Sequence, residues 1–223
     1  MQDAESPLPG RCGVGAGEVS EADVGTSSGG VARAPGRIDY YVAAIDLRWL
    51  PEEPIASFRR RYDPTVDLLG PHLTLVFPVP ISLGYDAVRE HVGDVLARTP
   101  AFDIRLHGLE ESWDHWLFLV VAEGRERVIA LHDDLYAGIL SPYLWTEQPY
   151  LPHVGLGLFA DERDTGDLLE LRPRRLDRER FDRALREAEA LELDYAGRID
   201  SVWISGLDEE LTHVTGLEEL PLA

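Results

Sequence analysis

The sequence predicts an α+β fold made of two similar lobes. Three observations lead to this prediction. Helix-like and strand-like stretches alternate from residue 37 to the C-terminus, the order helix, strand, helix, strand, strand occurs twice, and each copy includes a short strand that begins with Pro-His. An element order that recurs in this way indicates duplication of one α+β unit, although few residue identities repeat between the copies.

The first copy begins at residue 37, where a polar segment gives way to the apolar and aromatic run RIDYYVAAIDLRWL. This run predicts a buried strand over about 38–47. A short helix is expected next, because Ile55, Phe58 and Tyr62 recur at helical spacing. The strand PHLTLVFP, a helix near 84–98 with three valines on one face, and strands near 102–108 and 115–122 complete the copy.

The second copy repeats this order with a longer first helix. That helix, near 125–140, is expected to bury four apolar side chains: Val128, Leu131, Leu135 and Ile139. The strand PHVGLGLF at 152–159, a helix near 177–190, and strands near 193–204 and 211–219 follow.

Residues 1–36 differ from the rest of the chain in composition. They are rich in Gly, Ser, Ala and acidic residues and contain almost no large apolar side chain. Such a segment cannot bury enough surface to offset the entropy lost on ordering. We therefore expect a disordered N-terminal tail at 1–36, followed by one domain of two pseudo-symmetric lobes at 37–223.

Charge and cysteine content limit the possible partners and cellular location. The 223 residues carry a formal charge of −20, so an acidic surface should repel long polyanions. Extended coating of nucleic acid is not expected unless the positive charge is concentrated in one cleft, and short nucleotides remain possible. The single cysteine, Cys12, excludes an intramolecular disulfide and a cysteine-built metal site. The chain shows no signal peptide and no apolar run long enough to span a membrane, so we expect a cytoplasmic protein, without a membrane partner.

The two histidine strands carry the chemistry. Side chains alternate between the faces of a strand, so His72 and Thr74 share one face, and His153 and Gly155 share the equivalent face of the second copy. A lone His-x-Thr is better explained by a half-buried histidine bonded to a carbonyl. Two copies in phase favour a functional pair, because two lobes related by a pseudo-twofold axis can bring both imidazoles to one cleft.

Two histidines around one small ligand suit in-line displacement at phosphorus. A neutral imidazole removes a proton from the attacking oxygen, and a protonated imidazole gives one to the leaving oxygen. Histidine fits both roles because its ordinary pKa of about 6.5 lets both forms coexist near neutrality. The hydroxyl of Thr74 can donate to a phosphate oxygen, and this chemistry requires no metal or other cofactor.

On these two motifs the sequence resembles the 2H phosphoesterase superfamily, which includes 2′-5′ RNA ligases and cyclic nucleotide phosphodiesterases and is defined by two His-x-Thr/Ser-x motifs. HLTL at 72–75 matches the first motif, and HVGL at 153–156 corresponds to the second. The preceding RRYDPTVDLLGPHLTLVFP, residues 60–78, is similar to the Tyr-Asp-Pro lead-in of many 2′-5′ RNA ligase family proteins. The resemblance covers about residues 38–220.

The resemblance implies two antiparallel sheets that line a central V-shaped groove, with helices outside and both motifs at the centre. His72 and His153 become the acid/base pair, and Thr74 becomes a phosphate anchor. Gly155 departs from the family, which has Thr or Ser there. Either a glycine lets the backbone N–H approach the phosphate, or the missing hydroxyl impairs turnover.

The expected function is a metal-independent phosphoesterase that acts on 2′,3′-cyclic phosphate or 2′-5′ linkages of nucleotides or RNA ends. The alternative is a nucleotide or RNA-end binding protein that keeps the groove but turns over weakly because of Gly155. The chain is expected to act as a monomer.

Tyr150, close to His153, is a candidate for stacking a base, although a core position explains it equally well. His132, with Asp133 and Asp134, is expected on a solvated helix face rather than in a metal site.

Overall fold

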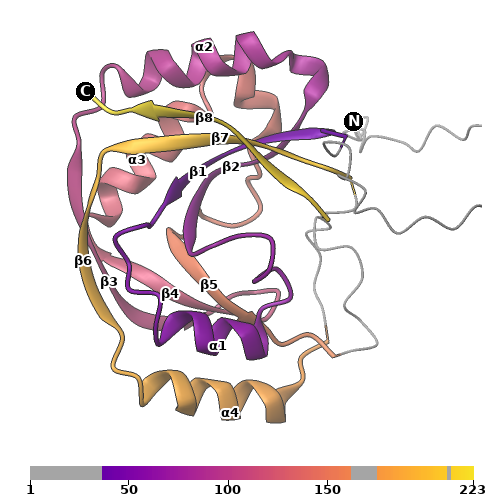
Figure 1. Cartoon of the computed structure of the whole chain (residues 1–223), viewed down its shortest axis with the longest axis vertical. Coiled ribbons are helices and arrows are strands. Elements are labelled where there is room, and N and C mark those ends of the chain that lie inside the picture. Colours follow the sequence, from indigo (N-terminus) through magenta and orange to yellow (C-terminus); the bar gives the residue numbers. More distant parts are fainter. Residues whose placement is uncertain (1–36, 162–174, 210–211) are drawn as a thin grey trace, which may run out of the picture. The chain divides into compact units, whose positions relative to one another are not determined.

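The computed structural model describes residues 37–161, 175–209 and 212–223. The expected tail at 1–36 lies outside the described residues and stays a prediction. Within the described part, the chain forms two four-stranded antiparallel sheets and four α-helices (Figure 1). The predicted α+β fold with two antiparallel sheets is therefore confirmed.

The first sheet has the strand order β2-β1-β7-β8, and all neighbours are antiparallel. Leu73 and Leu75 of β2 are fully buried, whereas His72 and Thr74 are half-buried, as the alternation predicted. One face of the sheet thus joins the core and the other carries the histidine. The strands are β1 (Tyr40–Asp46), β2 (His72–Pro80), β7 (Ser201–Leu207) and β8 (Val214–Pro221).

The second sheet has the order β5-β4-β3-β6, also antiparallel throughout. In β5, Val154 and Leu156 are buried, and His153 and Gly155 on the other face are half-buried. The two histidine strands, β2 and β5, are edge strands of their sheets and contact each other (Figure 1). The strands are β3 (Phe102–Glu111), β4 (Trp116–Glu123), β5 (His153–Leu158) and β6 (Asp194–Ile199).

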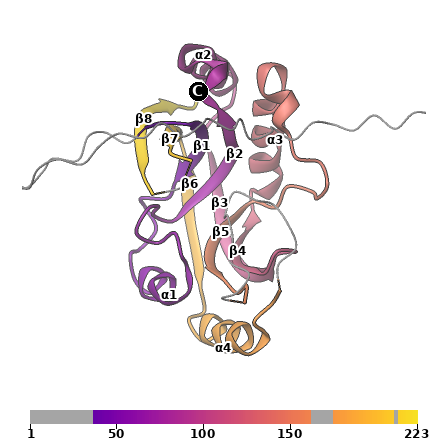
Figure 2. The ribbon, with the colours of Figure 1, turned by 90° about the vertical axis from the view of Figure 1, so that its right-hand side faces the viewer.

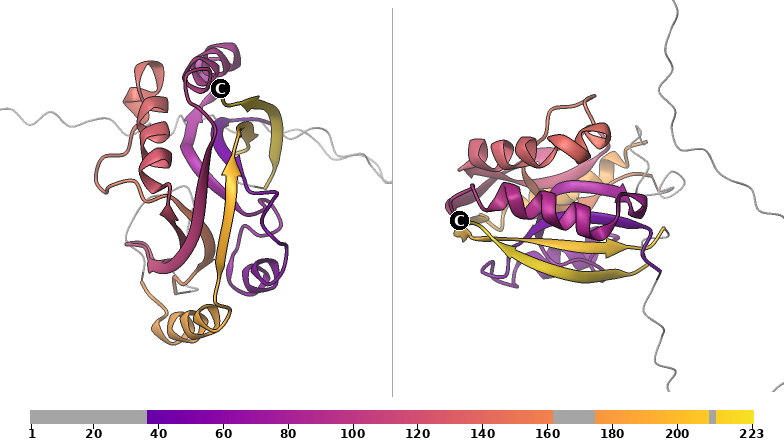
Figure 3. Two further views of the ribbon diagram at one scale, coloured as in Figure 1. Left: turned by 90° about the vertical axis from the view of Figure 1, so that its left-hand side faces the viewer. Right: turned by 90° about the horizontal axis from the view of Figure 1, so that it is seen from above.

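Each helix that precedes a histidine strand in the chain packs against the other histidine strand. Helix α1 precedes β2 in the chain but packs against β5, and α3 precedes β5 but packs against β2. Figures 1 and 2 show α2 and α3 at one end of the sheets and α1 and α4 at the other, and Figure 3 shows α2 beside α3. Each histidine strand is therefore supported by a helix of the opposite motif. The helices are α1 (Ile55–Tyr62), α2 (Tyr85–Leu96), α3 (Arg125–Leu135) and α4 (Arg178–Glu189).

The helices of the described residues are all short, and none has the length and apolar character that a membrane-spanning segment needs. Helix α2 buries Val88, Val92 and Val95, the three valines of its predicted apolar face.

Backbone groups at the edge of β2 form hydrogen bonds with tyrosines instead of with a further strand. An edge strand exposes backbone donors and acceptors that must find other partners. The N–H of Phe77 donates to the hydroxyl of Tyr136 at 2.9 Å, and the hydroxyl of Tyr150 donates to the carbonyl of Thr74 at 2.7 Å. These two bonds fasten β2 to the segment that contains α3 and leads into β5.

The sheets do not correspond to the two halves of the sequence. The strand expected over 193–204 is interrupted at Asp200, so that β6 joins the second sheet and β7 joins the first. The first sheet therefore combines β1 and β2 with the last two strands of the chain. Apolar residues on both sides of Asp200 led to the prediction of a single strand, but the alternation changes phase there, since the buried Ile199 is followed by the buried Val202 and Ile204.

The helix expected over 125–140 ends early, and Ile139 is not a core residue. Helix α3 stops at Leu135, and a 3₁₀ helix begins at Gly138, whose φ of +63° lies in the left-handed region. The change of direction leaves Ile139 40% exposed and buries Leu140 completely. Glycine adopts positive φ at no steric cost, so Gly138 is the sequence signal that marks this ending.

Gly157→Ala is expected to destabilise the fold. A Cβ at position 157 would lie 2.6 Å from the Cβ of Tyr62 and 3.0 Å from its carbonyl oxygen, so the end of α1 would have to move away from β5. Overpacking of this kind costs about 1–3 kcal/mol, which corresponds to a melting temperature lower by roughly 2–12 °C in a domain of this size.

Gly155→Ala, on the same strand, is the matched control. A Cβ there would meet only ordinary contacts at 3.7 Å. Equal melting temperatures for the two variants would show that α1 does not depend on close approach to β5.

Candidate active site

His72 is held at the start of β2 by its own backbone. Its Nδ1 lies 2.8 Å from the carbonyl oxygen of Gly70. A carbonyl oxygen only accepts, so Nδ1 carries the hydrogen and the lone pair of the neutral ring is on Nε2. Pro71 lies between donor and acceptor and fixes the backbone φ there, which orients the Gly70 carbonyl.

His153 repeats this arrangement at the start of β5. Its Nδ1 lies 2.5 Å from the carbonyl oxygen of Leu151, and Pro152 lies between them. Both Pro-His pairs thus have the same physical use, which is to tie Nδ1 to the carbonyl two residues earlier. In both rings Nε2 is left as the nitrogen that can accept or donate a proton.

The two imidazoles are close enough to interact electrostatically. Charge on His72 lowers the pKa of His153, and the strands that begin with these two residues, β2 and β5, contact each other. Loss of surrounding water is the largest influence and lowers the pKa of His153 to about 4. Phe118 contributes to this environment, because its ring stacks on His153 with centroids 3.5 Å apart and planes 17° apart.

His72 lies in a more charged environment. Burial lowers its pKa most, and the guanidinium of Arg59 lowers it further. The Gly70 carbonyl and the carboxylates of Asp63 and Asp46 act in the opposite direction. The neutral form of both histidines is therefore favoured in the free protein, and an anionic ligand between them would favour protonation.

Thr74 lies on the same face as His72, as predicted, one pleat further along β2. Its hydroxyl makes no hydrogen bond to any of the described residues, whereas its carbonyl accepts from Tyr150. The hydroxyl is thus available to a ligand beside the imidazole.

Tyr150 has partners within the protein that the sequence did not predict. Its ring stacks on His132 with centroids 3.8 Å apart and planes 5° apart, and its hydroxyl is bound to Thr74. A base could stack only on the opposite face of the ring. His132 itself is only 4% exposed, so the expectation of a solvated helix face was wrong for this residue. Its position four residues after Val128 places it on the apolar side of α3 and could have indicated this.

Gly155 has room for a larger side chain. The nearest atoms to a Cβ at this position would be Cε3 and Cζ3 of Trp116, both at 3.7 Å, which is ordinary van der Waals contact. The backbone conformation therefore does not require glycine, and the missing hydroxyl is a property of this sequence.

Gly155→Thr is expected to raise turnover roughly 2- to 10-fold, because a second hydroxyl would donate to the phosphate and a neutral hydrogen bond contributes about 0.5–1.5 kcal/mol. The measurement is kcat/KM on a 2′,3′-cyclic nucleotide. Gly155→Ala adds the Cβ without the hydroxyl and should leave kcat/KM unchanged. A loss of activity in both variants would show that the site needs glycine itself at this position.

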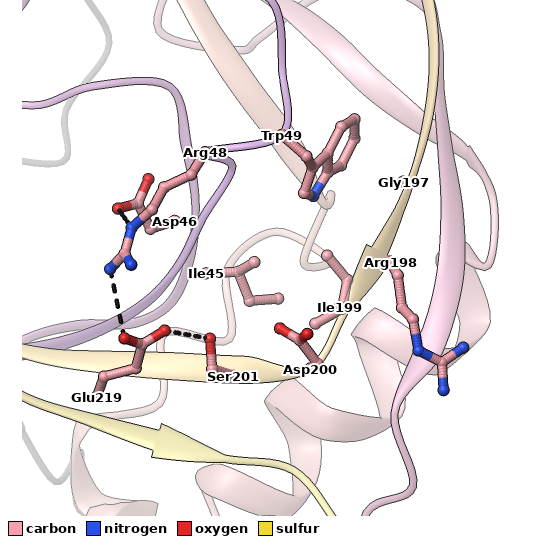
Figure 4. A pocket seen from close by; sticks show the side chains of 10 residues that line it. All are labelled: Ile45, Asp46, Arg48, Trp49, Gly197, Arg198, Ile199, Asp200, Ser201 and Glu219. Carbon is pink, nitrogen blue, oxygen red and sulfur yellow. Dashed lines mark hydrogen bonds and ion pairs between the residues drawn. The ribbon is translucent and has the colours of Figure 1, made fainter.

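A surface pocket of about 360 Å³ adjoins the site at the end of β1 (Figure 4). Its wall includes Asp46, the register partner of His72 on the neighbouring strand, so pocket and imidazole share one face of the first sheet. Arg48 pairs with Asp46 at 2.9 Å and with Glu219 at 3.5 Å, and its guanidinium lies 4.6 Å from the ring centroid of Trp203. Because two carboxylates balance this cation, the pocket offers less attraction to phosphate than the histidine pair.

Comparisons with known proteins agree with this fold. Residues 49–197 match the 2′-5′ RNA ligase superfamily. A Bacillus licheniformis protein whose name assigns it provisionally to the phosphoesterases is 26% identical over 115 residues, which are 51% of this chain and 67% of that protein. Escherichia coli LigT complexed with 3′-AMP has a TM-score of 0.53 at 18% identity, over 84% of this chain and 99% of that chain. A crystal structure described as a phosphoesterase has a TM-score of 0.51 at 18% identity, with the same shares covered.

Proposed function

Because the chain belongs to the 2′-5′ RNA ligase superfamily, we propose that it is a metal-independent phosphoesterase. Its substrates are 2′,3′-cyclic phosphates or 2′-5′ linkages of nucleotides or RNA ends. The observation that carries the proposal is the matched pair of imidazoles, each tied through Nδ1 to the carbonyl two residues earlier. A purely structural role for one histidine would not explain why the same arrangement occurs on two contacting strands.

The pair supplies both proton transfers of a displacement at phosphorus. One neutral Nε2 takes a proton from the attacking water or hydroxyl as its oxygen bonds to phosphorus. The other imidazolium gives its proton to the ribose oxygen as the phosphorus–oxygen bond breaks. Each transfer contributes about 10²–10⁴-fold, and together they leave no step that needs a metal.

The surroundings of the pair favour a small anionic substrate. The hydroxyl of Thr74 can donate to a non-bridging phosphate oxygen, and the phosphate charge would favour the protonated imidazole that acts as acid. The formal charge of −20 opposes binding of long RNA, so a nucleotide or the end of an RNA is the fitting substrate.

The second candidate is a binding protein with the same groove and little turnover. Gly155 favours it, because the second motif lacks the hydroxyl that its backbone would accommodate. Such a protein would bind a nucleotide phosphate at the two histidines without cleaving it.

The test is turnover of the four 2′,3′-cyclic nucleotides and of 2′-5′-linked dinucleotides, with and without EDTA, and with products assigned by ³¹P NMR. We expect hydrolysis that EDTA leaves unchanged. Calorimetric binding without any product would support the binding protein instead. Activity that disappears with EDTA and returns with a divalent metal would refute the two-histidine mechanism.

A further inference from the structure

A buried ion pair lies beneath the segment that leads into His72. Arg59 of α1 is 3% exposed and Asp63, one turn later, is 6% exposed. The Nε of Arg59 donates to Oδ2 of Asp63 at 2.7 Å, and Nη2 lies 2.7 Å from the same oxygen. Both charged groups are thus withdrawn from water and compensated by each other.

The pair fastens both ends of the segment between α1 and β2. At the near end, Oδ1 of Asp63 accepts from the N–H and the hydroxyl of Thr65, each at 2.7 Å. At the far end, Nη2 of Arg59 donates to the carbonyl of Leu69 at 2.8 Å. The next carbonyl, that of Gly70, is the one that holds Nδ1 of His72. One guanidinium therefore connects the end of α1 to the peptide group that immediately precedes the one bonded to the imidazole.

Stability alone does not account for this pair. Withdrawing two charges from water is costly, and replacing a buried ion pair by packed apolar side chains is often neutral or stabilising. The neighbouring residue Arg60 shows the ordinary arrangement, because its pair with Glu53, at 2.6 Å, is solvent-exposed. A buried pair that bonds to the backbone of the segment leading into His72 fits a role in positioning that segment.

We propose that Arg59 and Asp63 are positioning residues, which fix the segment from Asp63 to Pro71 so that the Gly70 carbonyl holds His72 in its reactive orientation. This inference rests on the proposed function for its effect on turnover. The electrostatic environment of His72 can also be measured without any substrate, through the pKa of the ring.

The charges around His72 make the role distinguishable from simple support. Four groups act on the ring or adjoin it: Arg59 from α1, Asp63 from the following segment, Asp46 from β1, and His153 from β5. Arg59 lowers the pKa of His72, whereas Asp63 raises it. Removing the cation should therefore raise that pKa, and removing the carboxylate should lower it further.

The experiment compares Arg59→Met, Arg59→Lys and Asp63→Asn with Arg60→Met as the matched control. Turnover of a 2′,3′-cyclic nucleotide gives kcat and KM, and NMR titration of the histidine Cε1–H signals, assigned with His72→Ala, gives the pKa of His72. We expect kcat to fall about 10-fold in Arg59→Met with KM nearly unchanged, as a misplaced group predicts. Arg59→Lys, which keeps the charge but has a single donor nitrogen in place of the guanidinium, should retain more activity, and Arg60→Met should match the wild type.

The pKa of His72 should rise in Arg59→Met and fall in Asp63→Asn, although both variants should melt at lower temperature. If Arg59→Met does not fold, the kcat and the His72 pKa of Arg59→Lys and Asp63→Asn are compared with those of the wild type and Arg60→Met instead. Destabilised variants with wild-type kcat and an unmoved His72 titration would overturn the inference. Absence of turnover in the wild-type protein would overturn the proposed function alone, because the His72 titration does not require turnover.

Discussion

His72→Ala and His153→Ala are each expected to lower kcat on a 2′,3′-cyclic nucleotide by about 10²-fold or more, with modest changes in KM. Each substitution removes one of the two proton transfers and leaves the phosphate contacts in place. Both rings are only half-buried, so both variants should fold. The double variant should be far less active than the wild type but not multiplicatively worse than either single variant, since the two groups act as a unit.

His107→Ala is the control for these substitutions. The side chain of His107 is 61% exposed and lies on β3, outside the contact of β2 with β5. Its kcat and KM should equal those of the wild type. Near-wild-type activity in either His72→Ala or His153→Ala would exclude a mechanism that uses both imidazoles.

The elements that the sequence predicted well are those whose pattern is local. Burial of alternate residues placed His72–Leu75 of β2 and His153–Leu156 of β5 with the correct faces, and the three valines of α2 placed its inner side. The partition of strands between sheets depends on pairing between distant segments, which a local pattern does not encode. The break at Asp200 shows this, because the chain passes there from the second sheet, which contains β6, to the first sheet, which contains β7.

The candidate site shows the same division between local and distant information. The repeated Pro-His identified both histidines, because each is oriented by its own preceding backbone. The stacking of Phe118 on His153 joins residues of different strands and has no local signal. Arg59 and Asp63 are separated by one helical turn, so their pairing could have been predicted, but not their burial or the bond to Leu69.

The pH dependence of turnover is expected to be displaced toward acid. Burial lowers the pKa of His153 to about 4, and it also lowers the pKa of His72 from the ordinary value of about 6.5. At neutral pH most of the free protein therefore holds two neutral imidazoles. That form contains a base but lacks the acid that protonates the leaving oxygen.

General acid/base catalysis needs one neutral and one protonated ring. As the pH falls through the upper apparent pKa of the pair, the first proton binds and kcat/KM rises; as it falls through the lower one, the second proton removes the base. A bell-shaped kcat/KM with its maximum between about pH 4 and 6.5 follows, declining about 10-fold per pH unit above the upper limb. The upper limb of kcat should lie at higher pH, because bound phosphate stabilises the imidazolium.

Stability has to be measured over the same pH range. An unfolded histidine takes up its proton near pH 6.5, whereas folded His153 does so only near about 4, so between these values the unfolded chain binds more protons. The contribution of His153 to the free energy of unfolding is therefore fully present above about pH 6.5 and is lost as the pH falls toward about 4. Melting temperatures at each pH separate this loss from the acid limb of catalysis, and a saturating nucleotide 3′-phosphate should move the titration of both histidines upward. A kcat/KM that stays level from about pH 5 to 8 in folded protein would contradict the lowered pKa values and the acid/base roles derived from them.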